Sequence, residues 1–251
     1  MNPSAIVAIT GASSGIGASL AIEAAKRGGR VGLMARRVEE LETVAQAVRD
    51  AGGEAMIVPT DVGERSSVEG AFQAIEREWG LPDMVVANAG IGLPTSVRKM
   101  DLDQVETVFR VNFFGVLNCA HAVLNPMVKR GSGQFAAVSS LAGWRGLPFS
   151  GAYSASKAAV SAWMEASRVE LKGSGVTLTT VHPGFVRTPM TAKNRFPMPF
   201  LMDSTEASRI MYKGIVSGAS EVNFPFPTTT LMRVARLLPN AVFDRAIGRR
   251  F

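Results

Sequence analysis

Short apolar runs alternate with amphipathic segments through most of this 251-residue chain. The apolar runs lie at residues 5–10, 30–35, 54–58, 83–87, 134–139 and 176–182. Segments with helical spacing lie between them, at residues 16–27, 38–51, 65–79, 101–130 and 153–172. Parallel strands are buried on both faces and need crossover helices, so the alternation predicts an α/β fold with a doubly wound parallel sheet.

The alternation runs on without an internal repeat or a low-complexity linker, so we expect residues 1–251 to form a single domain. Residues 184–203 depart from it, because they are rich in Pro, Met and Phe and have no clear period. They form either a substrate loop that closes over a ligand or an ordinary loop, and we favour the substrate loop. Residues 228–251 form a basic, amphipathic C-terminal extension.

The charge of the chain is unevenly distributed. The net charge is +6, and residues 230–251 hold five arginines and one aspartate, which is four of the six charges. The rest of the chain is close to neutral, which argues against nucleic-acid binding by the whole domain. The single cysteine, Cys119, excludes an intrachain disulfide. No signal peptide and no apolar run near 18 residues is visible, so we expect a cytoplasmic protein.

A glycine-rich turn follows the first apolar run. Glycine lets a backbone turn tightly and approach a diphosphate closely, and the next helix presents its free N–H groups to the anion. The alternative is a turn that only packs, but its position after a buried strand favours dinucleotide binding. The residues that we expect to bind the cofactor here are Gly11, Ser13, Ser14, Gly15, Ile16 and Gly17.

The end of the second apolar run indicates which dinucleotide is bound. An NAD site usually has an acidic residue there, whereas this chain has Arg36 and Arg37. A guanidinium group matches the geometry of a phosphate, so these arginines and Ser13 are predicted to hold the 2′-phosphate of NADP(H). They could instead be solvated surface arginines. We therefore expect NADP(H) as cofactor rather than NAD(H).

Residues 5–190 resemble the short-chain dehydrogenase/reductase family. The resemblance rests on the glycine turn and on several further motifs, which occur in the family's order and spacing. Those that correspond to cofactor contacts are Asp61, Val62, Asn88, Ala89, Gly90, Pro183, Gly184, Val186 and Thr188. Ala87 stands where the family has an asparagine. The catalytic motifs correspond to Asn112, Ser140 and the Tyr-x-x-x-Lys pair of Tyr153 and Lys157.

The family implies a Rossmann-type sheet of about seven strands in the order 3-2-1-4-5-6-7, with helices on both faces. It implies that Ser140 holds the substrate oxygen, that Lys157 binds the nicotinamide ribose, and that Asn112 holds a water leading to solvent. It also implies a homodimer or homotetramer formed through residues 101–130 and 153–172.

The Tyr153–Lys157 pair can also be interpreted without the family. Residues four apart lie on one side of a helix, so both side chains can face one cleft. A tyrosine normally titrates near pH 10, too high for efficient proton transfer at neutral pH. We expect the ammonium group of Lys157 and an oxidised nicotinamide to lower the pKa of Tyr153.

The substrate is less well indicated than the cofactor. Apolar candidates for the pocket are Ala142, Trp144, Phe149, Phe185 and Met190, with Phe196, Phe200 and Met202 beyond them. They favour a hydrophobic ketone, aldehyde or secondary alcohol. His182, His121 and Cys119 are expected to be structural, and no metal-ligand pattern is visible.

Three other functions remain open. One is a dinucleotide-binding sensor or scaffold without catalysis, and another is an epimerase or dehydratase on the same fold. The third is recruitment to a membrane surface, because Leu231, Val234, Leu237 and Leu238 can form an apolar stripe beside Arg233 and Arg236. The same stripe could cover the domain's own core or a partner subunit.

Overall fold

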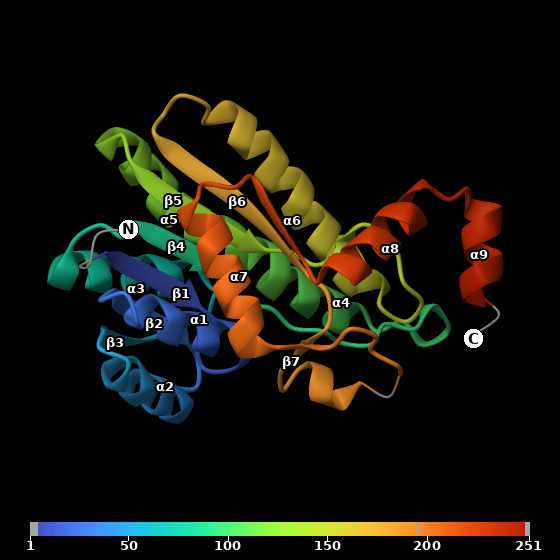
Figure 1. Ribbon diagram of the computed structural model, residues 1–251, viewed down its shortest axis with the longest axis horizontal. Helices are drawn as coiled ribbons and strands as arrows, with labels where there is room; N and C mark the ends of the chain where they lie inside the picture. The colour runs from blue at the N-terminus through green and yellow to red at the C-terminus, as the bar shows by residue number, and fades with distance from the viewer. Residues whose placement is uncertain (1–4, 195, 249–251) are drawn as a thin grey trace.

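A computed structural model describes residues 5–194 and 196–248. Seven strands form one parallel sheet in the order β3-β2-β1-β4-β5-β6-β9, which confirms the predicted α/β fold (Figure 1). These strands are β1 Ile6–Thr10, β2 Arg30–Ala35, β3 Glu54–Pro59, β4 Met84–Ala87, β5 Gly133–Val138, β6 Val176–Pro183 and β9 Glu221–Phe224. The helices that cover the sheet are α1 Gly15–Ala25, α2 Val38–Asp50, α3 Arg65–Trp79, α4 Leu102–Phe109, α5 Gly115–Arg130, α6 Gly151–Glu170 and α7 Ser204–Val216.

The sheet is covered on both faces because side chains alternate along each strand. In β1, Val7 and Ile9 belong to the core cluster that contains α1, α2 and α7 residues. Ala8 points to the opposite core, with residues of α3, α5 and α6. Two buried layers on one parallel sheet explain why the strands are apolar runs rather than alternating ones.

The order of the strands reverses at β1. Strand β1 pairs with β2 on one side and with β4 on the other, both in parallel. The connections that follow β1 and β4 therefore leave the sheet toward opposite faces, an arrangement that in open α/β sheets makes a crevice between them at the carboxyl ends of the strands. Open α/β sheets bind their ligands at such a point.

Residues 101–130 were predicted as one helix. Leu102–Arg130 is a continuous helical run, but a π-helical segment, Arg110–Phe114, separates α4 from α5. Within the described residues it is the one helix with the length and mean hydropathy, 1.3, to cross a membrane. Here Val116, Cys119 and Val123 are buried against the sheet, so the run is a core helix of the domain.

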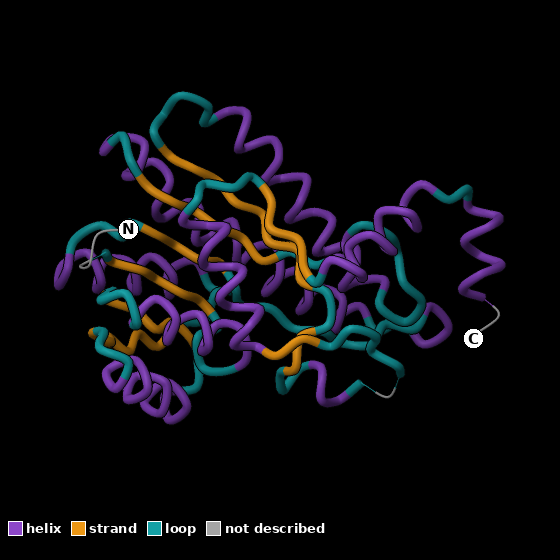
Figure 2. The backbone as a smooth tube through the Cα atoms, viewed as in Figure 1, coloured by secondary structure: helices purple, strands orange, loops and turns teal. Residues whose placement is uncertain are grey.

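The region after β6 contains elements that the residue pattern did not predict, namely α7 and the edge strand β9. Within residues 184–203, the short strands β7 Val186–Arg187 and β8 Met202–Asp203 pair in parallel. Helices α8 Phe226–Leu237 and α9 Asn240–Gly248 extend beyond the end of the sheet, as Figures 1 and 2 show. We call residues 226–248 the C-terminal arm. Arg249 and Arg250 of the predicted basic extension lie outside the described residues.

Candidate active site

The turns that follow β1 and β4 are joined by hydrogen bonds. The backbone N–H groups of Asn88 and Ala89 both donate to the Thr10 hydroxyl, each at 3.0 Å. The Asn88 amide donates in turn to the carbonyl of Thr10 at 2.9 Å. The two turns are thus held side by side at the point where the strand order reverses.

Small residues make this crevice narrow. Gly11 has φ +66°, and a Cβ there would lie 2.8 Å from the Cα of Ala89. A Cβ on Gly17 would collide with the carbonyl oxygen of Gly11. The first N–H groups of α1 have no partner within the helix, and its first turn contains no acidic residue. The turn therefore fits a diphosphate group, which needs a closely approaching backbone and free N–H donors.

Arg37 faces the glycine turn. Its Nη2 donates to the hydroxyls of Ser13 and Ser14 at 2.9 and 3.0 Å. Its Nη1 lies 3.0 Å from a carboxylate oxygen of Glu40. A guanidinium and two hydroxyls therefore converge beside the start of α1, a donor set that matches a phosphate.

Arg36 lies against the residues that follow β3. Its Nη1 is 3.7 Å from a carboxylate oxygen of Asp61, and both side chains are partly exposed. Asp61 also accepts a hydrogen bond from the N–H of Gly63 at 2.9 Å. Val62 is buried, and its carbonyl accepts from the Asn118 amide at 2.9 Å. Of the two arginines, Arg36 therefore lies against Asp61, and Arg37 is the one that bonds to the glycine turn.

The Tyr153–Lys157 pair lies at the start of α6, opposite the end of β5. Lys157 is 3% exposed, and its Nζ donates to the carbonyl of Val138 at 2.7 Å. The same Nζ is 5.9 Å from the centroid of the Tyr153 ring. The Tyr153 hydroxyl contacts the side chain of Ser140. The structure thus brings the predicted phenol, ammonium and serine hydroxyl together.

Asn112 lies in the middle of the π-helical segment and is fully buried. Its side chain accepts from the N–H of Ile91 at 2.8 Å and donates to the carbonyl of Ile91 at 3.0 Å. It also donates to the Ser156 hydroxyl at 3.1 Å. A Cβ on Gly90 would lie 3.3 Å from both Asn112 Oδ1 and Lys157 Nζ, so Asn112 and Lys157 border the same turn.

Burial controls the electrostatics of this pair. Burial lowers the pKa of Lys157 from 10.5 to about 8, because the charged ammonium is poorly solvated. Burial raises the pKa of Tyr153, and the hydrogen bond to Ser140 opposes that rise. The lowering expected from Lys157 together with an oxidised nicotinamide stays a prediction, and desolvation is the largest effect on the pKa of Tyr153 among the protein's own groups.

The family model for short chain dehydrogenases matches residues 5–198. The chain is a short-chain dehydrogenase/reductase. It is 43% identical over 241 residues to an uncharacterised oxidoreductase of Myxococcus xanthus, and the match covers 96% of this chain and 95% of the other. It is 37% identical over 188 residues to the cis-4-hydroxycyclohexanecarboxylate dehydrogenase of Sinomonas cyclohexanicum, covering 74% and 75% of the two chains.

The fold also matches solved structures. A short-chain dehydrogenase/reductase of Burkholderia phymatum, solved in complex with NAD, superposes with a TM-score of 0.86 at 22% identity, over 92% of each chain. This likeness confirms the Rossmann-type fold. Membership of the family makes the protein an oxidoreductase of CH–OH and C=O groups that uses a nicotinamide dinucleotide.

Of the apolar residues predicted for the pocket of this short-chain dehydrogenase/reductase, Met190 lies near Tyr153. A Cβ on Gly92 would lie 3.7 Å from Met190 Sδ and 3.9 Å from a Tyr153 ring carbon, so Met190 reaches the site. Phe185 packs on Phe196, with ring centroids 5.9 Å apart. Phe149 is half exposed just before α6.

Of the other two predicted pocket residues, Ala142 donates its N–H to the Ser140 hydroxyl at 3.1 Å. Trp144 packs instead on His182, with ring centroids 5.4 Å apart.

The remaining predicted cofactor residues lie at the end of β6 and in the loop that follows it. A Cβ on Gly15 would lie 3.0 Å from a methyl carbon of Thr188, so this loop faces the glycine turn. Pro183 ends β6 and Gly184 follows it, and the Pro183 carbonyl lies 3.4 Å from the Ser140 hydroxyl. Val186 is buried in the core beside α7.

Sequence reasoning missed several polar residues that support the site. Thr10 joins two turns, Ser156 bonds to Asn112, and Ser139 and Ser161 bond to the carbonyl of Lys157 at 2.7 and 3.1 Å. Ser161 is eight residues after Tyr153, so helical spacing could have placed it on the same side of the helix. The role of Thr10 had no signal, because it depends on two distant turns meeting.

The residues predicted to be structural have structural contacts. Cys119 is fully buried, and burial raises the pKa of its thiol to about 12. His121 pairs with Glu69 at 3.6 Å on the surface. Within residues 5–194 and 196–248, no group of three or more His, Cys, Asp or Glu side chains could hold a metal ion.

Proposed function

We propose that this chain transfers a hydride between NADP(H) and a hydrophobic ketone, aldehyde or secondary alcohol, with Tyr153 as the proton-transfer residue. The observation that carries the proposal is the convergence of Tyr153, Lys157 and Ser140 beside the crevice of the glycine turn. A catalytically silent scaffold would not need a buried ammonium group, which is costly to desolvate.

Each side chain has a separate task in this mechanism. When bound, the nicotinamide ring supplies or accepts the hydride and, in its oxidised form, adds a positive charge beside the phenol. The Ser140 hydroxyl orients the substrate oxygen next to the Tyr153 hydroxyl. In reduction, Tyr153 donates its proton to that oxygen, and in oxidation it removes the proton. Lys157 contributes positive charge and holds the ribose, and Asn112 holds a water that leads to solvent.

NADP(H) is the proposed cofactor because of Arg37. A phosphate on the adenosine ribose would lie beside the guanidinium, which already bonds to Ser13 and Ser14. A carboxylate oxygen of Glu40 also lies 3.0 Å from Nη1 of this guanidinium. Nη1 is not the atom that bonds to Ser13 and Ser14, because Nη2 makes both of those hydrogen bonds. Arg36 contributes positive charge at the edge of this site.

A hydrophobic substrate is proposed because of apolar side chains in the loop of residues 184–203 and just before α6. Met190, which lies near Tyr153, is exposed in that loop together with Phe196 and Phe200, and Phe149 is half exposed just before α6. Exposed apolar side chains around a polar catalytic group are typical of a pocket that binds an apolar ligand. We propose that this loop closes over the substrate.

Tyr153→Phe tests the proposal directly. The variant keeps the ring but cannot transfer a proton, so we expect turnover to fall at least about a thousandfold. Binding of NADPH, measured by fluorescence titration, should stay within about twofold, since the lost hydroxyl faces the substrate. Turnover at the wild-type rate would reject Tyr153 as the proton-transfer residue.

The substrate class needs a separate experiment. A panel of ketones, aldehydes, secondary alcohols and polar sugars is assayed with NADPH, NADH and their oxidised forms by absorbance. We expect apolar carbonyl compounds and alcohols to react best, and to react with NADP(H). Reaction with sugars alone would reject the hydrophobic substrate, and a product formed without change in the nicotinamide would indicate an epimerase or dehydratase.

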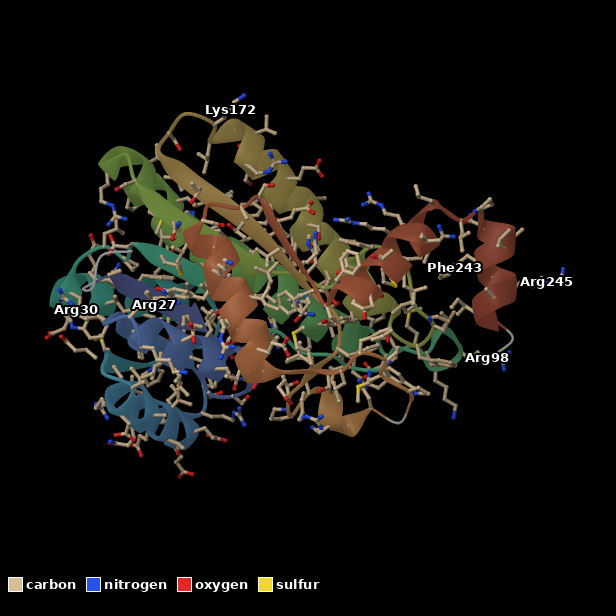
Figure 3. All side chains as sticks on the ribbon, viewed as in Figure 1. Arg27, Arg30, Arg98, Lys172, Phe243 and Arg245 are labelled. Carbon is tan, nitrogen blue, oxygen red and sulfur yellow. The ribbon has the colours of Figure 1, made fainter. Side chains whose placement is uncertain are left out.

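Recruitment to an anionic membrane is a second proposal, and it rests on the C-terminal arm. Phe226 and Leu237 are 80% and 84% exposed, and Leu231, Val234 and Val242 are at least half exposed. Figure 3 shows Phe243 and Arg245 on α9, at the end of the molecule away from α2 and α3. Exposed apolar residues combined with arginines suit a membrane surface that carries negative charge.

Flotation with vesicles of anionic or zwitterionic lipid tests this recruitment. We expect binding to the anionic vesicles only, and we expect loss of it when residues 230–251 are deleted. Failure to bind at low salt would reject the proposal.

Association into a homodimer or homotetramer in the cytoplasm is also proposed. Leu102 and Phe114 on the run of residues 101–130, and Val169 on α6, are more than half exposed. Light scattering coupled to size exclusion measures the mass, and a monomer would contradict the proposal.

A further inference from the structure

A buried polar cluster lies directly behind the Tyr153–Lys157 pair. Three consecutive residues at the end of β5 each contact this pair: Val138, Ser139 and Ser140. The Val138 carbonyl accepts from Lys157 Nζ at 2.7 Å, the Ser139 hydroxyl donates to the Lys157 carbonyl at 2.7 Å, and Ser140 contacts the Tyr153 hydroxyl. Both ends of Lys157 are therefore held by consecutive residues, Val138 at the end of β5 and Ser139 directly after it.

Ser161 completes the cluster from α6. Its hydroxyl donates to the Lys157 carbonyl at 3.1 Å and lies 2.8 Å from the Ser139 hydroxyl. Its third neighbour is His182 on β6, whose Nε2 is 3.0 Å away. His182 is 2% exposed and lies on β6, the third element of the cluster. It is connected to the backbone carbonyl of Lys157 through the Ser161 hydroxyl.

We propose that His182 is a positioning residue for the hydride-transfer reaction, which fixes the Ser161 hydroxyl on the carbonyl of Lys157 and so sets the position of the ammonium group beside Tyr153. The inference rests on the roles proposed above for Tyr153 and Lys157. His182 does not touch the reacting atoms. It acts through Ser161.

The surroundings of His182 favour a fixed, uncharged ring. Trp144 packs on the imidazole, and Arg233 lies 5.9 Å from the centroid of the Trp144 ring. Burial lowers the pKa of His182, the carboxylate of Glu221 and the side chain of Asn223 raise it, and Arg236 lowers it. Burial is the largest effect, so the neutral ring is favoured. When the Ser161 hydroxyl donates to the Lys157 carbonyl, its oxygen can only accept from His182, so the proposed arrangement has the ring proton on Nε2.

The two ring nitrogens differ in their partners, which allows matched variants. Nε2 faces Ser161, whereas Nδ1 is buried on the side of the ring away from Ser161, and the Asn223 side chain is the other hydrogen-bonding group beside the ring. His182→Gln places a polar atom near the position of Nε2, His182→Asn places one near Nδ1, and His182→Leu places none. Of the two ring nitrogens, Nε2 is the one that connects to Lys157 through Ser161. The proposal therefore predicts a higher kcat for the Gln variant than for the Asn and Leu variants.

The experiment compares these variants with the wild type in kcat, KM and the pH profile of alcohol oxidation. We expect kcat to fall roughly tenfold or more in the Leu and Asn variants, because a small displacement of a reacting group costs this much. KM for the substrate should stay within about twofold. The pH at which kcat rises should move upward, since Tyr153 loses part of the support of the ammonium charge. The Gln variant should retain most of kcat and the wild-type profile.

Ser161→Ala removes the same connection from the other side, and it decides the question if His182→Leu does not fold. It should reproduce the lower kcat and the shifted profile, and the double variant with His182→Leu should be no slower. Equal losses in the Gln and Leu variants, wild-type kcat in Ser161→Ala, or an unchanged pH profile would each overturn the proposal. Tyr153→Phe separates the two inferences, because retained turnover there would reject the proposed mechanism itself.

Discussion

The strand-end region and the C-terminal arm differ in how closely their side chains are packed. In the strand-end region, which comprises the turns after β1, β4 and β5 and the start of α6, glycines and small polar residues meet at van der Waals and hydrogen-bond distance. In the arm, large apolar side chains such as Phe226 and Leu237 are more than three quarters exposed. In the first region Gly11 and Gly17 leave no room for a Cβ atom, whereas the second region has few neighbours that a new side chain would disturb.

The difference teaches where substitutions act. At Gly11 and Gly17 in the strand-end region, a single added carbon must strain the backbone or displace a neighbour. In the arm, the same change affects mainly what the surface can bind. Four substitutions test this contrast, and they follow in order of the expected energy.

Lys157→Met tests the cost of a buried charge in the strand-end region. The pKa of Lys157 is about 8 in the folded protein and 10.5 in the unfolded chain, so the unfolded chain binds more protons between these values. This lysine therefore adds stability as the pH rises from 8 to 10.5, and the contribution is lost as the pH falls through 8. The free energy of unfolding of the wild type, relative to the variant, should rise by at most about 3 kcal/mol across this window.

Urea denaturation at several pH values measures this difference, and Lys129→Met, at an exposed lysine, controls for the loss of a positive charge. A difference between wild type and Lys157→Met that does not change with pH would show that the ammonium is not desolvated.

Gly11→Ala tests the lack of room. The added Cβ would lie 2.8 Å from the Cα of Ala89, at φ +66°. We expect a cost of about 2 kcal/mol and about thirtyfold weaker binding of the dinucleotide. Gly52→Ala is the matched control, because Gly52 has φ +90° but nothing within 4 Å. The control should lose about 1 kcal/mol of stability and keep its affinity. Equal affinity in both variants would remove the contrast.

Arg37→Ala tests the phosphate site at the border of the strand-end region. The guanidinium is partly exposed, so we expect about tenfold weaker binding of NADPH, or about 1.4 kcal/mol. Binding of NADH should be unchanged, because NADH lacks the 2′-phosphate. Isothermal titration measures both affinities, with Arg36→Ala as the comparison. An equal loss for the two dinucleotides would show that Arg37 does not select between them.

Leu237→Ser tests the arm, and its effect on stability should be the smallest. Leu237 is 84% exposed, so the free energy of unfolding should change by less than about 0.5 kcal/mol. Leu20→Ala, in the fully buried part of α1, should cost about 3 kcal/mol. The Leu237 variant should float less with anionic vesicles. A large loss of stability would mean that the arm is covered, for instance by a second subunit.

Most of the sheet could be predicted from the sequence, because runs such as residues 5–9 and 84–87 are uniformly apolar. Strand β9 could not, since Glu221 and Asn223 alternate with Val222 and Phe224 in a strand of four residues at the edge. The π-helical segment around Asn112 was also missed, because its residues have the composition of an ordinary helix. The buried amide of Asn112 lies in this segment, and such π-helical turns inside α-helices are frequent at functional sites.

The candidate site was predicted better by motif order than by chemistry. Tyr153, Lys157, Ser140 and Asn112 lie together in the structure, and Arg37 bonds to Ser13 and Ser14. The desolvation that raises the pKa of Tyr153 was not predicted, because burial cannot be judged from spacing. The support by Ser139, Ser161 and His182 depends on three elements meeting, which the residue pattern does not encode.

The single cysteine of the chain has a practical consequence for studying the arm. Cys119 is fully buried and burial raises the pKa of its thiol to about 12, so it holds almost no thiolate at neutral pH. A fluorophore or spin label added to the native protein therefore finds no reactive thiol. Replacing Leu237 by cysteine would give one labelling position, from which the approach of the arm to lipid or to another subunit can be followed optically without first removing the natural residue.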